Sequence, residues 1–292
     1  MAFGLPGNRA EALIARVGEV MTLPTVVKQV IDLTNHPATN SKMLAEAIGN
    51  DPVLAAKVLR TANSSFFGFS SKTVDIGSAV TRLGLKQVRS VALATGVGKM
   101  FGGAADKDGY SRPNLWKHSV AVGTMNEVLA SICSVQGIRQ TAGTALLAGL
   151  VHDIGIIVED QYLPNKWAQV PSSAFMLKES LPAIETQQFG FNHAEVGSGL
   201  LHRWKFADEV IAAVAGHHRP KADSSLICVM TAMSELLVAR AAVGYCDCHP
   251  ARESADTFAM LQKRLSLVGP AVMQVHESFQ SRIAETLEIL AL

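Results

Sequence analysis

The chain has 292 residues, 48% of them hydrophobic and 17% charged, so it is long enough to bury one large core or two smaller ones. Its 26 lysines and arginines nearly balance its 25 aspartates and glutamates, which leaves no general signal for a nucleic acid or an anionic membrane partner. This composition excludes a disordered protein, and four cysteines are too few for a disulfide framework.

Two stretches of the sequence bear on where in the cell the protein is expected to be. The N-terminal sequence MAFGLPGNRAEALIARVGEV lacks the basic-then-apolar order of a signal peptide. The longest apolar run, at residues 141–158, is interrupted by His152 and Asp153 and so falls short of an uncharged bilayer span. We therefore expect a cytoplasmic protein without a membrane segment.

Apolar residues recur with a helical period along almost the whole chain. Ser41 is the expected cap of one helix, and Asp51 caps the next, with Pro52 at its first position. No stretch alternates as a half-buried strand would. The sequence therefore predicts an all-α fold, a multi-helix bundle, with helices over residues 23–36, 41–50, 51–65, 83–97, 115–132, 144–158, 191–204, 208–218 and 226–240.

Two breaks divide this helical pattern. Glycine, aspartate and proline cluster in FGGAADKDGYSRP at residues 101–113, and a second break, AAVGYCDCHPARESAD, covers residues 241–256. We expect an N-terminal helical half at 1–110, a histidine-bearing half at 111–240 and a C-terminal helical extension at 241–292. CDCH, Cys246 to His249, looks like half a zinc site, but no second ligand pair follows it.

Five histidines and one aspartate fall on apolar helical faces: His118, His152, Asp153, His193, His217 and His218. A buried, ionised carboxylate without a partner is very costly, so the aspartate needs a cation, a hydrogen-bond network or a metal. Imidazole together with carboxylate suits Zn, Fe, Mn or Ni better than Ca or Mg. A hydrogen-bonded polar core without metal is the alternative that the residues leave open.

Several stretches occur in an order that resembles a known family. They are Leu23-Pro24, Asp51-Pro52, Leu59 to Asn63-Ser64, Ala79 with Leu83-Gly84, LWKHS, LLAGLVHDIG, IETQQFGFNHAEVGSGLLHRW and AVAGHH. From about Leu23 to Arg240 the chain resembles the HDOD family, an output-domain branch of the HD metal-dependent phosphohydrolases. The resemblance implies an all-helical bundle. It also implies that His118, His152, Asp153, His193, His217 and His218 match the ligand positions of catalytic HD relatives, so we expect one or two divalent transition-metal ions, Fe, Mn, Ni or Zn.

The chain departs from the catalytic HD pattern at three points. Aligning LICVMTAMSELLVAR by its apolar face places Ser234, with Glu235 beside it, where HD relatives have a last Asp ligand. Ile156 follows HDIG where relatives that cleave cyclic dinucleotides have Lys, and no Gly-Tyr-Pro follows the paired histidines.

Two functions remain open on this resemblance. The favoured one is a signalling or regulatory output module with a metal-binding, catalytically impaired site and a partner signalling protein. The alternative is a metal-dependent phosphohydrolase that acts on a nucleotide or phosphodiester.

Overall fold

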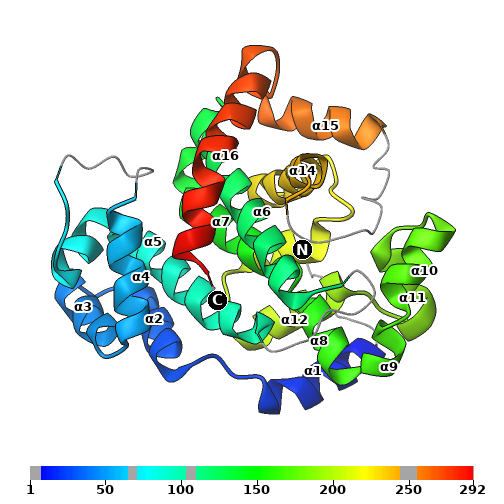
Figure 1. Ribbon diagram of the computed structural model, residues 1–292, viewed down its shortest axis with the longest axis horizontal. Helices are drawn as coiled ribbons and strands as arrows, with labels where there is room; N and C mark the ends of the chain where they lie inside the picture. Colours follow the sequence, from blue (N-terminus) through cyan, green and yellow to red (C-terminus); the bar gives the residue numbers. More distant parts are fainter. Residues whose placement is uncertain (1–7, 65–70, 103–109, 244–254, 292) are drawn as a thin grey trace. The chain divides into compact units, whose positions relative to one another are not determined.

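The computed structural model describes residues 8–64, 71–102, 110–243 and 255–291. Helices make up most of these residues, and none of them forms a β-sheet (Figure 1). The all-α prediction is confirmed. The chain divides into two compact units, Met1–Thr22 with Phe101–Phe279 and Leu23–Met100 with Gln280–Leu292.

The smaller unit contains four α-helices and half of a fifth: α2 (Thr25–Asn35), α3 (Ser41–Gly49), α4 (Pro52–Ala62), α5 (Ile76–Gly98) and the second half of α16 (Pro270–Ile289). Asp51 caps α4 as predicted, accepting hydrogen bonds from the backbone of Val53 and Leu54. The predicted cap Ser41 is instead the first residue of α3, because the Asn40 side chain accepts the bond from the Met43 nitrogen. The core of this unit consists of aliphatic residues of α2 to α5.

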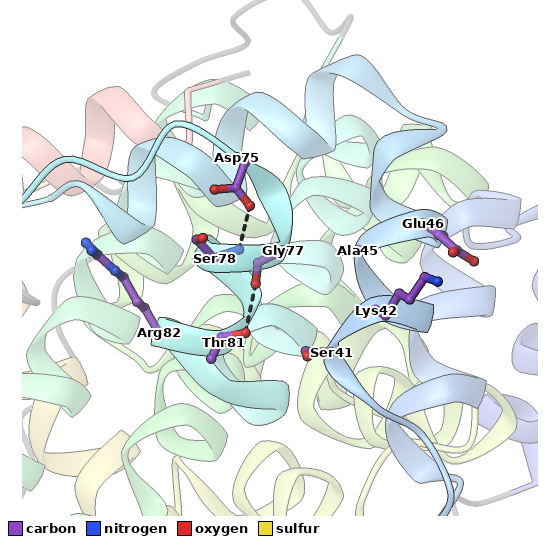
Figure 2. A pocket seen from close by; sticks show the side chains of 9 residues that line it. All are labelled: Ser41, Lys42, Ala45, Glu46, Asp75, Gly77, Ser78, Thr81 and Arg82. Atoms are coloured by element: carbon purple, nitrogen blue, oxygen red, sulfur yellow. Dashed lines mark hydrogen bonds between the residues drawn. The ribbon is translucent and has the colours of Figure 1, made fainter.

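The smaller unit also has an open pocket of about 650 Å³ between the start of α3 and the first turns of α5 (Figure 2). Lys42 and Glu46 line it from α3, and Asp75 and Arg82 line it from the α5 side. Asp75 is already used as the α5 cap, since it accepts a hydrogen bond from the Ser78 nitrogen at 2.8 Å. No histidine of the predicted site lines this pocket.

The larger unit contains the remaining helices: α1 (Asn8–Val20), α6 (Arg112–Ile132), α7 (Ala142–Val151), α8 (Ile154–Tyr162), α9 (Pro164–Trp167), α10 (Val170–Leu177), α11 (Leu181–Phe189), α12 (His193–Arg203), α13 (Asp208–Gly216), α14 (Leu226–Ala241), α15 (Ala255–Leu265) and the first half of α16. Of the two predicted breaks, residues 103–109 and 244–254 lie outside the described residues, and the CDCH stretch lies among them. The helices that follow begin at Arg112 and Ala255.

The most apolar segment of the larger unit is Ala142–Tyr162, which α7 and α8 make up. It is long and apolar enough to cross a bilayer, but 83% of its apolar window is buried in this structure. The core helix of a folded domain passes the same test, so the segment is weak evidence for a membrane span.

Glycines bring the helices that carry the predicted site into backbone contact. A Cβ atom on Gly149 of α7 would lie 2.5 Å from the nitrogen of Gly123 on α6. A Cβ atom on Gly155 of α8 would overlap the carbonyl oxygen of His193, the first residue of α12. Gly155 is the glycine of the HDIG stretch, so part of that sequence serves the close approach of α8 and α12.

Candidate metal centre

Four pieces of the larger unit bring the six predicted residues together. His118 lies within α6, as the apolar stripe predicted. His152 and Asp153 lie in the joint between α7 and α8, not inside one continuous helix as the apolar run suggested. His217 and His218 follow the last turn of α13, and His193 opens α12.

The position of His193 is set by a capping box. Asn192 accepts a hydrogen bond from the Glu195 nitrogen at 3.1 Å, and Glu195 accepts one from the Asn192 nitrogen at 3.2 Å. This reciprocal pair fixes the start of α12. The backbone nitrogen of His193 also donates to the buried carboxylate of Glu185, at 2.9 Å.

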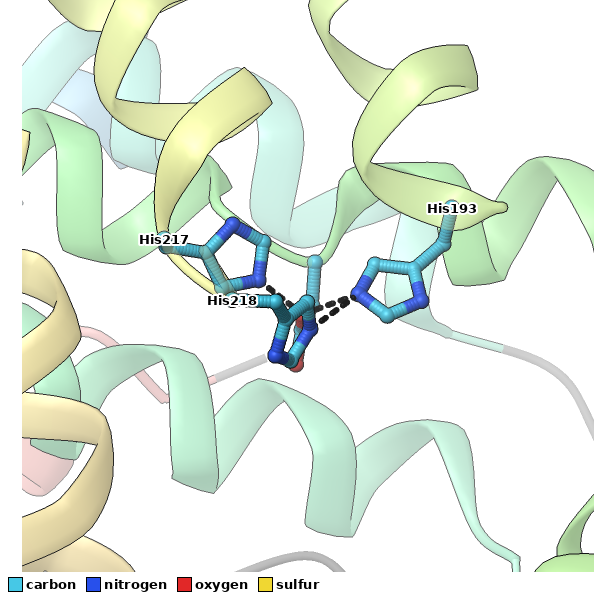
Figure 3. A group of neighbouring side chains, drawn as sticks. His193, His217 and His218 are labelled. Carbon is cyan, nitrogen blue, oxygen red and sulfur yellow. Dashed lines mark hydrogen bonds and ion pairs between the residues drawn. The ribbon is translucent and has the colours of Figure 1, made fainter. Parts of the chain in front are cut away.

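The potential ligand atoms form two groups that share Asp153. In one group, Asp153 Oδ1 lies 3.3 Å from His193 Nε2 and 3.6 Å from His217 Nε2. His218 completes this group, with its Nε2 atom 2.8 Å from His193 Nε2 (Figure 3). In the other group, Asp153 Oδ2 lies 3.2 Å from His152 Nε2 and 3.9 Å from His118 Nε2.

Glu235 adds a second carboxylate to the cluster. Its Oε2 atom lies 2.8 Å from His118 Nε2 and 3.0 Å from His152 Nε2. The Ser234 side chain points elsewhere, donating to Asn126 Oδ1 at 2.8 Å. The alignment that placed Ser234 at the last ligand position is therefore wrong by one residue, and the helix presents a carboxylate to the cluster after all.

Hydrogen bonds on the far side of three rings leave Nε2 facing the cluster. His152 Nδ1 donates to the Gly149 carbonyl and His217 Nδ1 to the Val214 carbonyl, both at 2.7 Å. His193 Nδ1 donates to Glu185 Oε2, also at 2.7 Å. Such a bond fixes both the tautomer and the orientation of a metal-binding imidazole.

Carboxylates raise the pKa of two of the histidines. Burial alone would lower the pKa of His193, but the carboxylates of Glu185 and Asp153 outweigh it and raise the pKa to about 10. Burial opposes the charged form of His152 too, yet Asp153 and Glu235 hold its pKa well above the ordinary value. Both rings therefore favour their protonated forms while no metal is bound.

The other charges of the cluster follow from the same balance. Burial lowers the pKa of His217, and burial together with the neighbouring imidazoles of His217 and His193 lowers the pKa of His218. Burial would raise the pKa of Asp153 and Glu235, but the surrounding imidazoles hold both well below the usual range. The carboxylates and the imidazoles thus stabilise one another's charged forms, and a metal ion that binds through these nitrogens competes with protons.

The donor set fits a transition metal. His217 Nε2 is buried and has no hydrogen-bond partner among the described residues, although its Nδ1 is satisfied. A neutral imidazole with its lone pair aimed at a carboxylate is a typical metal ligand. Imidazole and carboxylate donors together suit Fe, Mn, Ni or Zn. A buried His/Asp cluster that could hold a metal ion is therefore present.

Two carboxylates around the cluster were missed in the sequence. Glu185 lies eight residues before His193 and has no accessible surface, and its contact with the ring depends on how α11 meets α12. Glu235 was noticed only as the neighbour of Ser234. Of the remaining histidines, His36, His202 and His276 are exposed, whereas His249 lies outside the described residues.

A further buried carboxyl group, Glu159 of α8, lies behind the cluster. It has no accessible surface, and neither oxygen has a hydrogen-bond partner among the described residues. Burial, together with the negative charge of Glu185, raises the pKa of Glu159 well above its ordinary value. We therefore expect this carboxyl group to be protonated at neutral pH.

We expect Glu159→Gln to stabilise the protein more at pH 8 than at pH 5. The raised pKa means that above the unfolded-state pKa the unfolded chain releases a proton that the folded chain retains, so stability falls as pH rises. The neutral amide of glutamine has no proton to release, so the variant keeps its stability at high pH. We expect its free energy of unfolding at pH 8 to exceed that of the wild type by ~1–3 kcal/mol. Urea unfolding at both pH values measures it, with the exposed Glu179→Gln as the matched control. If Glu159→Gln changed the free energy of unfolding equally at both pH values, Glu159 would not be a carboxyl group with a raised pKa.

The fold and the site together define a class: an all-helical protein with a buried cluster of histidines and carboxylates. The family model of the HDOD domain matches residues 20–220, and the chain belongs to the HDOD domain family. This confirms the resemblance identified in the sequence.

Three solved structures share the fold. An HDOD domain protein of unknown function from Geobacter sulfurreducens is 22% identical, with a TM-score of 0.76 over 97% of this chain and 98% of that one. A candidate phosphohydrolase from Shewanella amazonensis SB2B is 22% identical, with a TM-score of 0.71 over 96% and 97%. A candidate signal transduction protein from Marinobacter aquaeolei VT8 is 23% identical, with a TM-score of 0.72 over 97% and 64%.

A curated relative extends beyond the region of similarity. An uncharacterized protein of Treponema pallidum (strain Nichols) is 23% identical over 211 residues, which are 72% of this chain. The match spans only 39% of that relative's length.

Proposed function

We propose that this chain is a regulatory module whose cluster holds one or two divalent transition-metal ions, Fe, Mn, Ni or Zn. The proposed ligands are His118, His152, Asp153, His193, His217 and His218, with Glu235 added from the structure. In this function the cluster is a regulatory or stabilising centre and not an efficient catalyst. We also propose that the protein acts in the cytoplasm through a partner signalling protein.

The observation that carries this proposal is the closure of the site. The residues His118, His152, Asp153, His193 and His217 are each at most 5% exposed. Only His218 and Glu235 are partly accessible, and a quarter of the Glu235 side chain is exposed. A bound transition metal supplies a polarising charge and an activated water in hydrolases. The helices around the site leave little of the ligands exposed, so a phosphodiester has little access to a metal bound there.

A second argument concerns the handling of phosphate. Ile156 occupies the position of the lysine in relatives that cleave cyclic dinucleotides, and its side chain is buried in α8. A buried aliphatic side chain cannot steady a phosphate group, so the chain lacks one positive charge that those relatives use. The composition and the burial of Ala142–Tyr162 support the cytoplasmic location, and the Marinobacter aquaeolei relative supports a role in signalling.

A metal-dependent phosphohydrolase that acts on a nucleotide or phosphodiester is the second candidate. Glu235 favours it, because its carboxylate supplies the donor that seemed to be replaced by serine. The Shewanella amazonensis relative, named as a candidate phosphohydrolase, points the same way.

Metal analysis together with turnover assays separates these functions. We expect the full chain to contain bound transition metal and to show no robust hydrolysis of cyclic di-GMP or bis(p-nitrophenyl) phosphate, with Mn or Fe added. His152→Ala should lower both metal content and thermal stability, because metal binding to the native state stabilises it. The exposed His202→Ala is the matched control.

Two outcomes would contradict the regulatory proposal. Metal-dependent turnover near or above about 1 s⁻¹ would establish the phosphohydrolase instead. The second outcome is a wild-type protein that binds no metal and a His152→Ala variant that is as stable as the wild type. The cluster would then be only a hydrogen-bonded polar core.

A further inference from the structure

A polar cross-link in the core joins three helices beside the cluster. Asn126 of α6 has no accessible surface, and its Nδ2 atom donates to the Ala145 carbonyl of α7 at 2.8 Å. The same nitrogen donates to Thr231 Oγ1 of α14 at 3.1 Å, and Asn126 Oδ1 accepts from Ser234 Oγ at 2.8 Å. The amide thus binds α7 and α14 to α6 through three hydrogen bonds.

The direction of every hydrogen bond in this network is determined by its ends. The Ala145 carbonyl can only accept, so the Asn126 nitrogen faces it. The hydroxyl of Thr231 donates to the Ile227 carbonyl at 2.9 Å, which leaves its lone pair for the Asn126 amide. The Ser234 hydroxyl must then donate to the Asn126 oxygen. No member of the network has an alternative orientation that keeps all the bonds.

Apolar packing alone gives α14 little preference for one rotation about its axis. Eight successive residues, 227–234, are buried, so the buried surface extends around the helix. Hydrophobic burial is non-directional, whereas a buried hydrogen bond is satisfied in only one arrangement. A single buried polar residue fixes helix register in coiled coils for the same reason.

We propose that Ser234 is a positioning residue for the metal centre. Held by Asn126, it fixes the rotation of α14 so that the next residue, Glu235, faces His118 and His152. Successive residues of a helix differ by about 100°, so the face that carries Thr231 and Ser234 points at Asn126 while Glu235 points at the histidines. Ser234 is therefore the neighbour of the carboxylate that faces the cluster, Glu235, and not its replacement.

This inference rests on the proposed metal site only for its first test, which measures metal affinity. Ser234→Ala should keep the first equivalent of Co(II), bound by the group around His193, and weaken the second by about tenfold or more. Thr231→Val should act in the same direction, whereas Thr231→Ser, which keeps the hydroxyl, should restore wild-type binding and the wild-type Co(II) spectrum. Equal second-site affinity in wild type and Ser234→Ala would overturn the proposal.

The second test needs no metal. In the metal-free protein, Glu235→Gln should increase the unfolding constant by about tenfold in the wild-type background and by less than about twofold beside Ser234→Ala. Such coupling means that Ser234 acts through Glu235, whereas fully additive effects would show that the serine only stabilises the core. Should the wild type bind no metal, the proposed function fails, and this double-mutant cycle still decides the role of Ser234.

Discussion

Gly155→Ala should unfold the larger unit at a markedly lower temperature and remove the metal centre with it. The added Cβ atom would overlap the His193 carbonyl oxygen and lie 2.7 Å from the His193 carbonyl carbon. Both are backbone atoms at the start of α12, so no side chain can move aside to make room. The helices α8 and α12 must separate, and His193 then moves away from Asp153.

The expected cost is about 3 kcal/mol or more, at the upper end of the range for overpacked cores. For a unit of this size, that corresponds to a fall in melting temperature of about 6–12 °C. A graded control series is available: Gly197→Ala, whose Cβ would lie 3.2 Å from its nearest neighbour, and Gly49→Ala, which would meet nothing within 4 Å. Scanning calorimetry measures the three variants. A melting temperature for Gly155→Ala equal to that of Gly49→Ala would refute the close-approach argument.

Asp153→Asn should remove almost all bound metal, whereas His118→Ala should remove no more than one ion. Asp153 is the residue that both ligand groups share, with one oxygen turned toward each. The amide keeps the shape of the side chain and removes its charge. After reconstitution with Mn, Fe or Zn, the metal content of Asp153→Asn, measured by mass spectrometry, should fall below about a tenth of the wild-type value.

The same substitution should destabilise the metal-free protein. Asp153 balances the charge on His152 and His193, and its side chain is only 6% exposed. Removing one partner of such a buried pair costs on the order of 3–5 kcal/mol, because the other charge stays buried. The exposed Asp223→Asn is the control for a lost surface charge. Full metal content in Asp153→Asn would show that the ions bind elsewhere.

The sequence predicted the helices and the members of the cluster because both depend on local patterns. Helical periodicity identifies a buried stripe, and five histidines with one aspartate on such stripes must lie inside the larger unit. The family resemblance supplied the ligand positions. Local signals also predicted Asp51 as a cap, since its role depends only on the next few residues.

The rest of the site depends on contacts between distant segments. Glu185 reaches His193 because α11 leads into α12 at one particular angle, which no periodicity encodes. Ser234 and Glu235 are one residue apart, and α14 is buried around most of its surface, so its apolar pattern could not tell which of them faces the histidines. The joint at His152 and Asp153 was missed because its flanking residues are as apolar as a continuous helix.

The smaller unit joins two segments that are far apart in the chain, since residues 280–292 belong with residues 23–100. Lys57 of α4 donates a hydrogen bond to the Ala291 carbonyl at 2.9 Å, across 234 positions of sequence. During translation at about 5–20 residues per second, α2 to α5 leave the ribosome well before the segment that completes their unit. Nascent chains must therefore keep that unit unfinished, or partly ordered, for about 10–40 s after its first helices emerge. We expect the unit to be more accessible to chaperones and proteases during this interval than after it is complete.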